Sequence, residues 1–131
     1  MVKPAHTNIR VMDPDRSITF YRNVLGLEVV DRLHFDDFDL IFLRGEESEF
    51  ELELTWNHGQ QESYSHGSGY GHFAVSTGDI HGLYAQCAKK SLEPTPVKDL
   101  YSNGKLAVRF FFLTDPDGYM VEIVERQGRY V

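Results

Sequence analysis

An internal repeat constrains the fold of this chain more than any other feature, because both halves of the 131 residues show the same order of expected elements. The first half predicts a strand, a helix and three further strands, at 7–11, 14–25, 27–30, 38–43 and 50–56. The second half predicts a strand, a helix and two or three strands, with clear patterns at 70–76, 80–88, 105–114 and 119–124. This order predicts an α+β fold made of two βαβββ modules.

Cap and turn residues set the ends of several elements. Asp13 is a favourable N-cap, Pro14 suits the first helical position, and Gly26 can adopt the left-handed conformation that ends a helix. The first helix is therefore expected over 14–25. The sequence Asp-Pro-Asp-Gly at 115–118 predicts a tight turn between two strands, because proline presets φ and glycine tolerates a positive φ.

The segment 58–69 is polar and has no apolar periodicity, so it predicts a linker or loop rather than part of a core. We therefore expect a single domain over residues 1–131, made of repeats at about 1–57 and 70–131 that this segment joins. Modules of this kind have exposed sheet edges and an open concave face. Because two such faces can close on each other, a homodimer is expected.

Each half carries one histidine in its first strand and one glutamate in its last, and the two pairs have nearly equal spacing: His6 with Glu53 and His72 with Glu122. Two imidazoles and two carboxylates suit a divalent first-row metal and leave coordination positions for water or substrate. We therefore predict that these four residues are metal ligands. Glu51 shares a strand face with Glu53, and spacing alone does not choose between these two carboxylates.

Several other reactive side chains have no counterpart in the opposite half. Four histidines are expected to be surface residues: His34, His58, His66 and His81. The single cysteine, Cys87, falls on the apolar face of the second expected helix. It is therefore expected to be a small core residue rather than a nucleophile.

The composition excludes several classes of partner. Thirteen basic against twenty acidic residues give a net charge of −7, which argues against a nucleic-acid partner. The longest wholly apolar runs, such as Phe110–Leu113, are far shorter than the roughly 20 residues of a membrane span, so no membrane partner is expected. The first residues lack the apolar stretch of a secretory signal, and one cysteine cannot form an internal disulfide, so a cytoplasmic location is expected.

Motifs spread over nearly the whole chain resemble those of a known family. They are His6–Val11, Ser17–Tyr21 with Leu25–Leu27, Glu53–Asn57, Gly71–Ala74, and Asp115–Tyr119 with Glu122. Together they are similar to glyoxalase I, the lactoylglutathione lyase family of the vicinal oxygen chelate superfamily, whose fold is that of glyoxalase, bleomycin-resistance proteins and dihydroxybiphenyl dioxygenase. The resemblance selects Glu53 over Glu51, because Glu-Leu-Thr-aromatic-Asn begins at Glu53 and is quite specific to glyoxalase I.

The resemblance implies a metal-dependent enzyme that isomerises the hemithioacetal of methylglyoxal and glutathione to S-D-lactoylglutathione, which detoxifies methylglyoxal. His6, Glu53, His72 and Glu122 match the family's ligands for one divalent metal per site, with Ni²⁺ favoured and Co²⁺ or Zn²⁺ as alternatives. The reaction removes a proton next to a carbonyl, which is slow unless the negative charge of the enediolate is stabilised. Glu122 is the expected proton carrier, with Glu53 as the opposite carboxylate.

Glutathione carries carboxylates, so an acidic protein needs local positive charge around this substrate. The resemblance implies that Arg10 and Asn57 bind its γ-glutamyl end. Either Lys98 or Lys105 could match the family's lysine for the glycine end, because Asp99–Gly104 looks like an extra stretch relative to the short bacterial form. In the family one site takes its ligands from two chains, so shared sites in the expected homodimer are implied as well.

Other functions of the superfamily are alternatives. An extradiol dioxygenase uses two histidines and one glutamate around Fe(II), an epimerase acts on a CoA thioester, and a thiol transferase attacks fosfomycin. The fourth ligand, Glu53, and the motif that ends at Asn57 weigh against these enzymes. A metal-free module of the same fold sequesters drugs such as bleomycin, and the intact ligand set weighs against that function.

Overall fold

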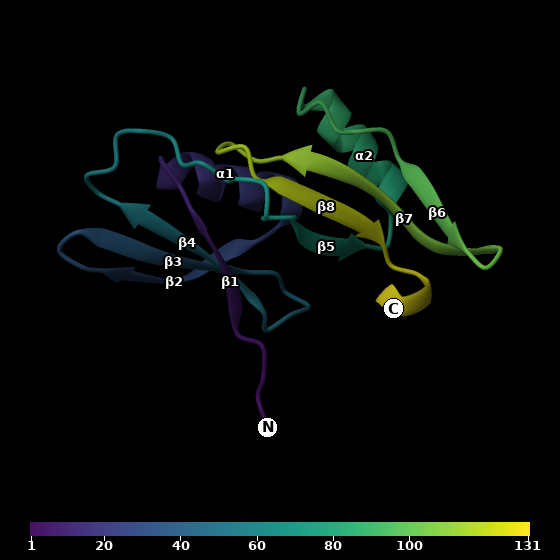
Figure 1. Cartoon of the computed structure of the whole chain (residues 1–131), viewed down its shortest axis with the longest axis horizontal. Helices are drawn as coiled ribbons and strands as arrows, with labels where there is room; N and C mark the ends of the chain where they lie inside the picture. Colours follow the sequence, from purple (N-terminus) through teal and green to yellow (C-terminus); the bar gives the residue numbers. More distant parts are fainter. The chain divides into compact units, whose positions relative to one another are not determined.

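The computed structural model describes residues 1–131, and the chain divides into two compact units, Met1–His66 and Gly67–Val131. The boundary falls within the polar segment 58–69, which forms turns and coil. Each unit contains one four-stranded sheet and one α-helix (Figure 1). The expected α+β fold of two βαβββ modules is confirmed.

The first unit has the elements β1 (His6–Arg10), α1 (Pro14–Leu25), β2 (Glu28–His34), β3 (Phe38–Arg44) and β4 (Glu51–Asn57). The strand order in its sheet is β1-β4-β3-β2, with β1 parallel to β4 and the other neighbours antiparallel. Strand alternation separates the two faces: Leu52 and Leu54 of β4 are buried, whereas Glu51 and Glu53 point to the opposite face. One face of the sheet therefore forms the core, and the other presents polar side chains.

The first helix, α1, has the predicted ends. The side chain of Asp13 accepts a hydrogen bond from a backbone N–H of the first turn, and Pro14 is the first helical residue. Gly26 follows the helix with a φ of 68°, in the left-handed region that closes a helix. Ile18 and Tyr21 are buried and join the core of the first unit.

The second unit repeats this plan with β5 (Phe73–Thr77), α2 (Ile80–Lys89), β6 (Lys98–Ser102), β7 (Lys105–Thr114) and β8 (Met120–Glu125), followed by the 3₁₀ turn η1 (Gly128–Tyr130). Its strand order, β5-β8-β7-β6, is equivalent to that of the first sheet, again with the first strand parallel to the last. Tyr84 of α2 packs edge to face on Phe111 of β7. Cys87 is buried in this core, as expected, and burial raises the pKa of its thiol. Neither α1 nor α2 has the length and apolar character that a membrane-spanning helix requires.

The start of the second unit differs from the sequence-based expectation. The strand expected from residue 70 begins at Phe73, so His72 lies immediately before β5 instead of within it. The turn that follows Asp115 ends before Met120, where β8 begins. The first pair between β5 and β8 is therefore Phe73 with Val121, and His72 has no partner in this ladder. The displacement is one residue, and His72 still adjoins the first strand of its unit.

The stretch Asp99–Gly104, which looked like an insertion, belongs to a β-hairpin. β6 pairs antiparallel with β7, and the innermost pair is Ser102 with Lys105. Asn103 and Gly104 connect the strands with φ values of 52° and 75°. Two consecutive residues with positive φ are typical of the two-residue hairpin turn that Asn-Gly favours. The Asn-Gly dipeptide was therefore the sequence signal for this hairpin. The hairpin adds β6, so three strands follow the helix in the second half, as in the first.

Candidate active site

The first expected ligand pair lies on the polar face of the first sheet. His6 opens β1 and Glu53 lies within β4, and the distance from His6 Nε2 to Glu53 Oε1 is 3.4 Å. Asn8, which is in register with Glu53, donates a hydrogen bond of 2.7 Å from Nδ2 to the same oxygen. Phe42 of β3 is also in register with Glu53 and packs its edge against the His6 ring. The pair is thus positioned by three strands of one sheet.

The second expected pair has equivalent geometry in the second unit. His72 Nε2 lies 3.3 Å from Glu122 Oε1. Phe112 of β7 is in register with Glu122 and packs edge to face with the His72 ring, as Phe42 does with His6. The residue of β5 in register with Glu122 is Ala74, where the first unit has Asn8. Glu122 therefore has no amide donor from this position, whereas Glu53 has one.

The chemistry and spacing of the donor atoms fit a transition metal. Nitrogen and carboxylate oxygen ligands bind such ions at about 2.1 Å, which separates neighbouring ligand atoms by roughly 3.0 to 3.4 Å in octahedral or tetrahedral geometry. The observed separations of 3.4 Å for His6 with Glu53 and 3.3 Å for His72 with Glu122 agree with this spacing. The donor atoms of each pair therefore have the spacing that two ligands of one divalent ion would have.

The competing carboxylate of Glu51 has a different partner. Glu51 Oε2 lies 3.8 Å from Nε of Arg44, in the neighbouring strand β3. In the structure Glu53, rather than Glu51, lies next to His6.

The residues expected to contact glutathione lie at ends of strands. Arg10 ends β1 and is exposed on the same face as His6. Asn57 ends β4, near the position where Arg10 pairs with Thr55, and its Nδ2 donates a hydrogen bond of 2.8 Å to the Tyr64 hydroxyl. Arg10 and Asn57 therefore lie at the same end of the paired strands β1 and β4.

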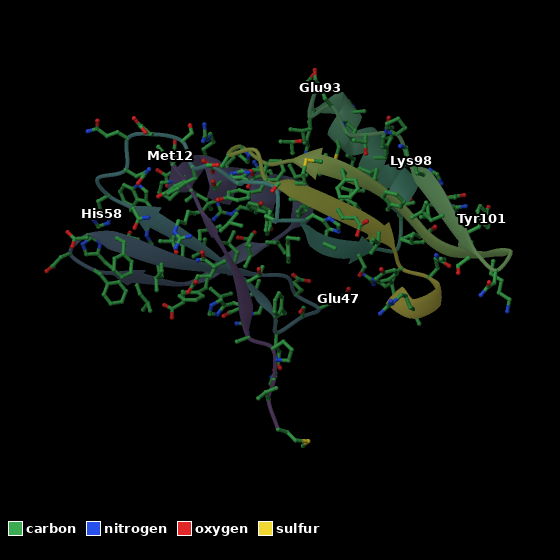
Figure 2. The ribbon with its side chains drawn as sticks, in the orientation of Figure 1. Met12, Glu47, His58, Glu93, Lys98 and Tyr101 are labelled. Carbon is green, nitrogen blue, oxygen red and sulfur yellow. The ribbon has the colours of Figure 1, made fainter.

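Both lysines that were candidates for the glycine end are exposed. Lys98 begins β6, where Figure 2 labels it, and Lys105 begins β7. Because the two strands form an antiparallel hairpin, Lys98 pairs with Phe110, and Lys105 lies at the turn. The two lysines are thus at opposite ends of the β6–β7 hairpin.

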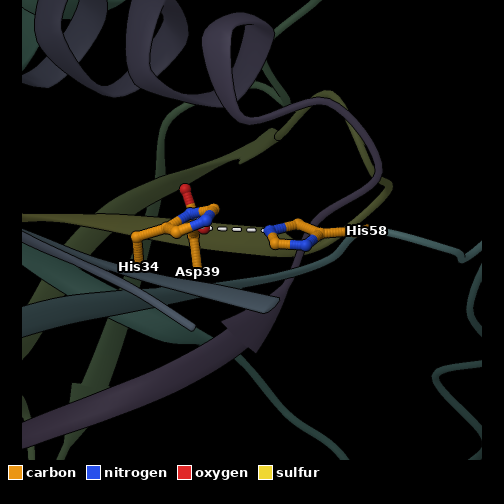
Figure 3. A group of neighbouring side chains, drawn as sticks. All are labelled: His34, Asp39 and His58. Atoms are coloured by element: carbon orange, nitrogen blue, oxygen red, sulfur yellow. Dashed lines mark hydrogen bonds and ion pairs between the residues drawn. The ribbon is translucent and has the colours of Figure 1, made fainter. Parts of the chain in front are cut away.

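Two histidines outside the expected site converge on one carboxylate (Figure 3). His34 Nδ1 lies 2.6 Å and His58 Nε2 2.9 Å from Oδ1 of Asp39. The side chain of His34 is 75% exposed, as expected for a surface residue, and that of His58 is half-buried, with 24% exposed. His58 is covered because its ring stacks on His34 and packs against Trp56.

Asp39 is an ionised group in an otherwise apolar row. It is 3% exposed and lies on the same face of β3 as the buried residues Ile41 and Leu43. The hydrogen bond with His58 lowers the pKa of Asp39 to about 2, with further hydrogen bonds from Arg32 and His34 acting in the same direction. Asp39 stands where the alternation of β3 predicts an apolar residue, and this mismatch is the sequence signal that could have revealed the cluster.

A family-wide sequence profile, described as the Glyoxalase/Bleomycin resistance protein/Dioxygenase superfamily, matches residues 3–123. The chain belongs to this superfamily. Curated relatives of the chain carry the name lactoylglutathione lyase. A lactoylglutathione lyase of Haemophilus influenzae is 38% identical over 94% of this chain and 92% of its own length. A lactoylglutathione lyase of Arabidopsis thaliana is 37% identical over 92% of this chain, which spans 43% of the plant protein.

Solved structures give the same assignment. Glyoxalase I of Leishmania major, described as trypanothione-dependent, has a TM-score of 0.76 and 36% identity, covering 95% of this chain and 87% of its own. Glyoxalase I of Zea mays has a TM-score of 0.82 and 30% identity, and this chain covers 45% of that protein. The predicted resemblance to glyoxalase I, the lactoylglutathione lyase, is confirmed by these relatives.

Proposed function

We propose that this chain is a lactoylglutathione lyase that isomerises the hemithioacetal of methylglyoxal and glutathione to S-D-lactoylglutathione. The proposal rests on one observation above all: two equivalent His–Glu pairs, His6 with Glu53 and His72 with Glu122, at metal-ligand spacing. The relatives of the chain carry the same activity name, and none of the alternative superfamily functions gains support from them.

His6, Glu53, His72 and Glu122 are proposed to hold one divalent metal per site, and Ni²⁺ is the favoured ion, with Co²⁺ and Zn²⁺ as alternatives. Two imidazoles and two carboxylates suit all three ions, and their affinity order alone does not identify the native one. The metal supplies positive charge beside the substrate oxygens while negative charge develops during proton transfer.

Glu122 is proposed to move the proton between the two substrate carbons. A hydrogen bond donated to a carboxylate oxygen occupies an acceptor site of that oxygen. Glu53 accepts such a bond from Asn8, whereas Glu122 faces Ala74, which has no donor. Ala74 leaves the Glu122 carboxylate open to the substrate proton on that side, and Glu53 serves as the opposite carboxylate and partner.

Arg10 and Asn57 are proposed to bind the γ-glutamyl end of glutathione. Their common position at one end of β1 and β4 places a guanidinium and an amide side by side on the polar face, which suits a ligand with a carboxylate and an amino group. Lys98 or Lys105 would then bind the glycine carboxylate. Because the Leishmania major relative is described as trypanothione-dependent, the assay should compare trypanothione with glutathione as the thiol.

The functional unit is proposed to be a homodimer in the cytoplasm, in which each site combines His6 and Glu53 of one chain with His72 and Glu122 of the other. The two pairs belong to different units of the chain, so a site with all four ligands has to join two units. The resemblance to glyoxalase I supports the proposal that these two units come from different chains.

The test removes metal with a chelator, restores Ni²⁺, Co²⁺ or Zn²⁺ separately, and follows thioester formation from methylglyoxal with glutathione or trypanothione. We expect metal-dependent turnover that Glu122→Gln lowers by about a hundredfold or more, because general acid–base catalysis contributes roughly that much. Glu51→Gln is the matched control, since Glu51 pairs with Arg44 on the same sheet face and should leave turnover nearly unchanged. Absence of turnover with every metal and both thiols would contradict the proposal.

A further inference from the structure

The cluster of His34, Asp39 and His58 lies at the end of the first sheet, where three strands bring the side chains together. His34 ends β2 and is in register with Asp39 of β3, and Asp39 is in register with Trp56 of β4, two residues before His58. The donor atoms His34 Nδ1, Asp39 Oδ1 and His58 Nε2 all lie within 4.8 Å of one another. Figure 3 shows the His58 ring directed at the carboxylate of Asp39.

This cluster is separate from the proposed catalytic half-site in the same unit. Asp39 belongs to the buried row of β3, together with Ile41 and Leu43. Phe42, which contacts His6, belongs to the alternate row of the same strand. Successive strand residues point to opposite faces, so the cluster and the His6–Glu53 pair lie on opposite faces of one sheet.

The surroundings of His58 contain more acceptors than a neutral imidazole can satisfy. Its Nε2 lies 2.9 Å from Oδ1 of Asp39, and its Nδ1 lies 3.2 Å from the backbone carbonyl oxygen of Asp36. Both neighbours are acceptors, whereas a neutral imidazole carries one N–H. If Nδ1 donates to the Asp36 carbonyl, the contact between Nε2 and Asp39 Oδ1 needs a proton or a metal ion between the two atoms. The hydrogen bonds of 2.6 and 2.9 Å have a proton in that place, and a bound ion would replace it and widen the separations to about 3 Å.

That arrangement is the one found around metal-binding histidines. A ligating imidazole usually donates its second ring N–H to a backbone carbonyl or a carboxylate, which fixes the tautomer and the ring orientation. The carbonyl of Asp36 fills this role for His58. Arg32 donates from Nε to Oδ2 of Asp39 at 2.9 Å, which leaves Oδ1 as the oxygen directed at both imidazoles.

We propose that His34 Nδ1, Asp39 Oδ1 and His58 Nε2 form a second metal site, for a borderline first-row divalent ion such as Ni²⁺, Cu²⁺ or Zn²⁺. Two imidazoles with one carboxylate favour these ions over Mg²⁺ and Ca²⁺, which prefer oxygen ligands. The exposed side of His34 leaves room for water to complete the coordination. The positive charge of Arg32 beside the carboxylate weakens the attraction for a cation, so this site binds more weakly than the four-ligand site.

The chain carries a built-in reporter for this site. Trp56 is its single tryptophan, and the Trp56 ring packs 4.6 Å, centroid to centroid, from the ring of His58. Ni²⁺ or Cu²⁺ bound at His58 Nε2 would lie close enough to quench the indole fluorescence. The readout is independent of catalysis.

The experiment titrates metal-free full-length protein with Ni²⁺ in a His6→Ala/His72→Ala background, which removes a histidine from each proposed catalytic half-site. We expect saturable quenching of Trp56 fluorescence with one Ni²⁺ per chain by calorimetry. Adding His34→Ala should weaken this binding at least about tenfold, and its exposed position makes loss of folding a minor concern. His81→Ala, at an exposed histidine of the second unit, is the matched control and should leave binding unchanged.

A second measurement reports the ligand atoms directly. The Cu²⁺ form of the same background protein should give an electron paramagnetic resonance spectrum with coupling to two imidazole nitrogens, reduced to one by His34→Ala. The proposal is overturned if the background protein binds no Ni²⁺ with quenching, or if His34→Ala leaves both the affinity and the nitrogen coupling unchanged. Neither outcome depends on whether the chain is a lactoylglutathione lyase.

Discussion

At the residue scale, the structure shows which parts of a site a repeat can predict. The four proposed ligands were found because equivalent positions in two halves carry the same residue types, and the structure places them in two His–Glu pairs. Asn8 was not singled out, because its role depends on the register that pairs it with Glu53, and register is not visible in a single strand. The contact of His58 with Asp39 was missed for the same reason, since the buried Asp39 belongs to another strand.

Asn8 gives a testable consequence at this scale. Asn8→Ala removes the hydrogen bond to Glu53 Oε1 and reproduces the situation of Ala74 beside Glu122. Groups that orient a metal ligand contribute about tenfold to a hundredfold in metal affinity, so we expect Ni²⁺ affinity to fall by that range. Competition with a chromophoric chelator measures the change. Asn23→Ala, at an exposed asparagine of α1, is the control, and an equal loss in both variants would show that Asn8 does not act through Glu53.

At the element scale, local signals predicted most boundaries. The cap residues of α1 and the alternation of β3, β4 and β7 each depend on a few neighbouring residues, and the elements follow them closely. The β6 strand was only an optional element, because its pattern is exposed throughout and has no buried face to reveal it. Its pairing depends on the Asn103–Gly104 turn and on the ion pair of Asp99 with Arg109 of β7.

The first element-scale prediction concerns the glycine that ends α1. Gly26 has a φ of 68°, and its neighbourhood leaves room for a Cβ atom, so Gly26→Ala adds backbone strain without a clash. We expect the free energy of unfolding to fall by about 1 kcal/mol, the typical cost of a left-handed alanine. Gly59→Ala is the matched control, because Gly59 also has open space but lacks a positive φ. Urea unfolding should show an effect for Gly26→Ala only, and equal effects would contradict the assignment.

The second element-scale prediction concerns the ion pair that joins β6 to β7. Arg109 Nε and the second guanidinium nitrogen donate to both oxygens of Asp99, at 2.8 and 3.0 Å. These hydrogen bonds hold the pKa of Asp99 below its ordinary value. A carboxyl group whose pKa is lower in the folded state stabilises the fold above its unfolded pKa, about 3.9, and loses that contribution as pH falls through the folded value.

The wild-type melting temperature should therefore exceed that of Asp99→Asn at pH 7, and the difference should shrink as the pH is lowered below about 4. Thermal unfolding followed by circular dichroism at a series of pH values provides the measurement. Glu46→Gln, at an exposed carboxylate in a turn, is the control and should leave the melting temperature nearly unchanged at each pH. A difference for Asp99→Asn that stays constant down to pH 2 would show that the pair is not linked to protonation.

At the scale of the whole molecule, the structure shows one His–Glu pair in each unit, and these pairs are the two halves of the proposed site. Each His–Glu pair depends on contacts within one sheet, which the repeat encodes twice. The sequence does not predict the interface that would bring the two pairs together. Such an interface is built from residues far apart in the sequence, and no periodic pattern identifies them. The shared-site homodimer therefore remains a proposal that the family resemblance supports, and it makes a prediction that pairs of inactive variants can test.

His6→Ala and His72→Ala each remove one ligand from every site, so each purified variant should be nearly inactive. In a mixed dimer with shared sites, one site receives both substitutions and the other receives neither. Unfolding and refolding an equimolar mixture should therefore restore about a quarter of the wild-type turnover, since half of the dimers carry one intact site of two. Mixing His6→Ala with Glu53→Gln is the control, because both changes lie in the same half-site and no mixed dimer regains an intact one. If sites were built within single chains, neither mixture would recover activity, so recovery in the first mixture alone identifies the dimer as the catalytic unit.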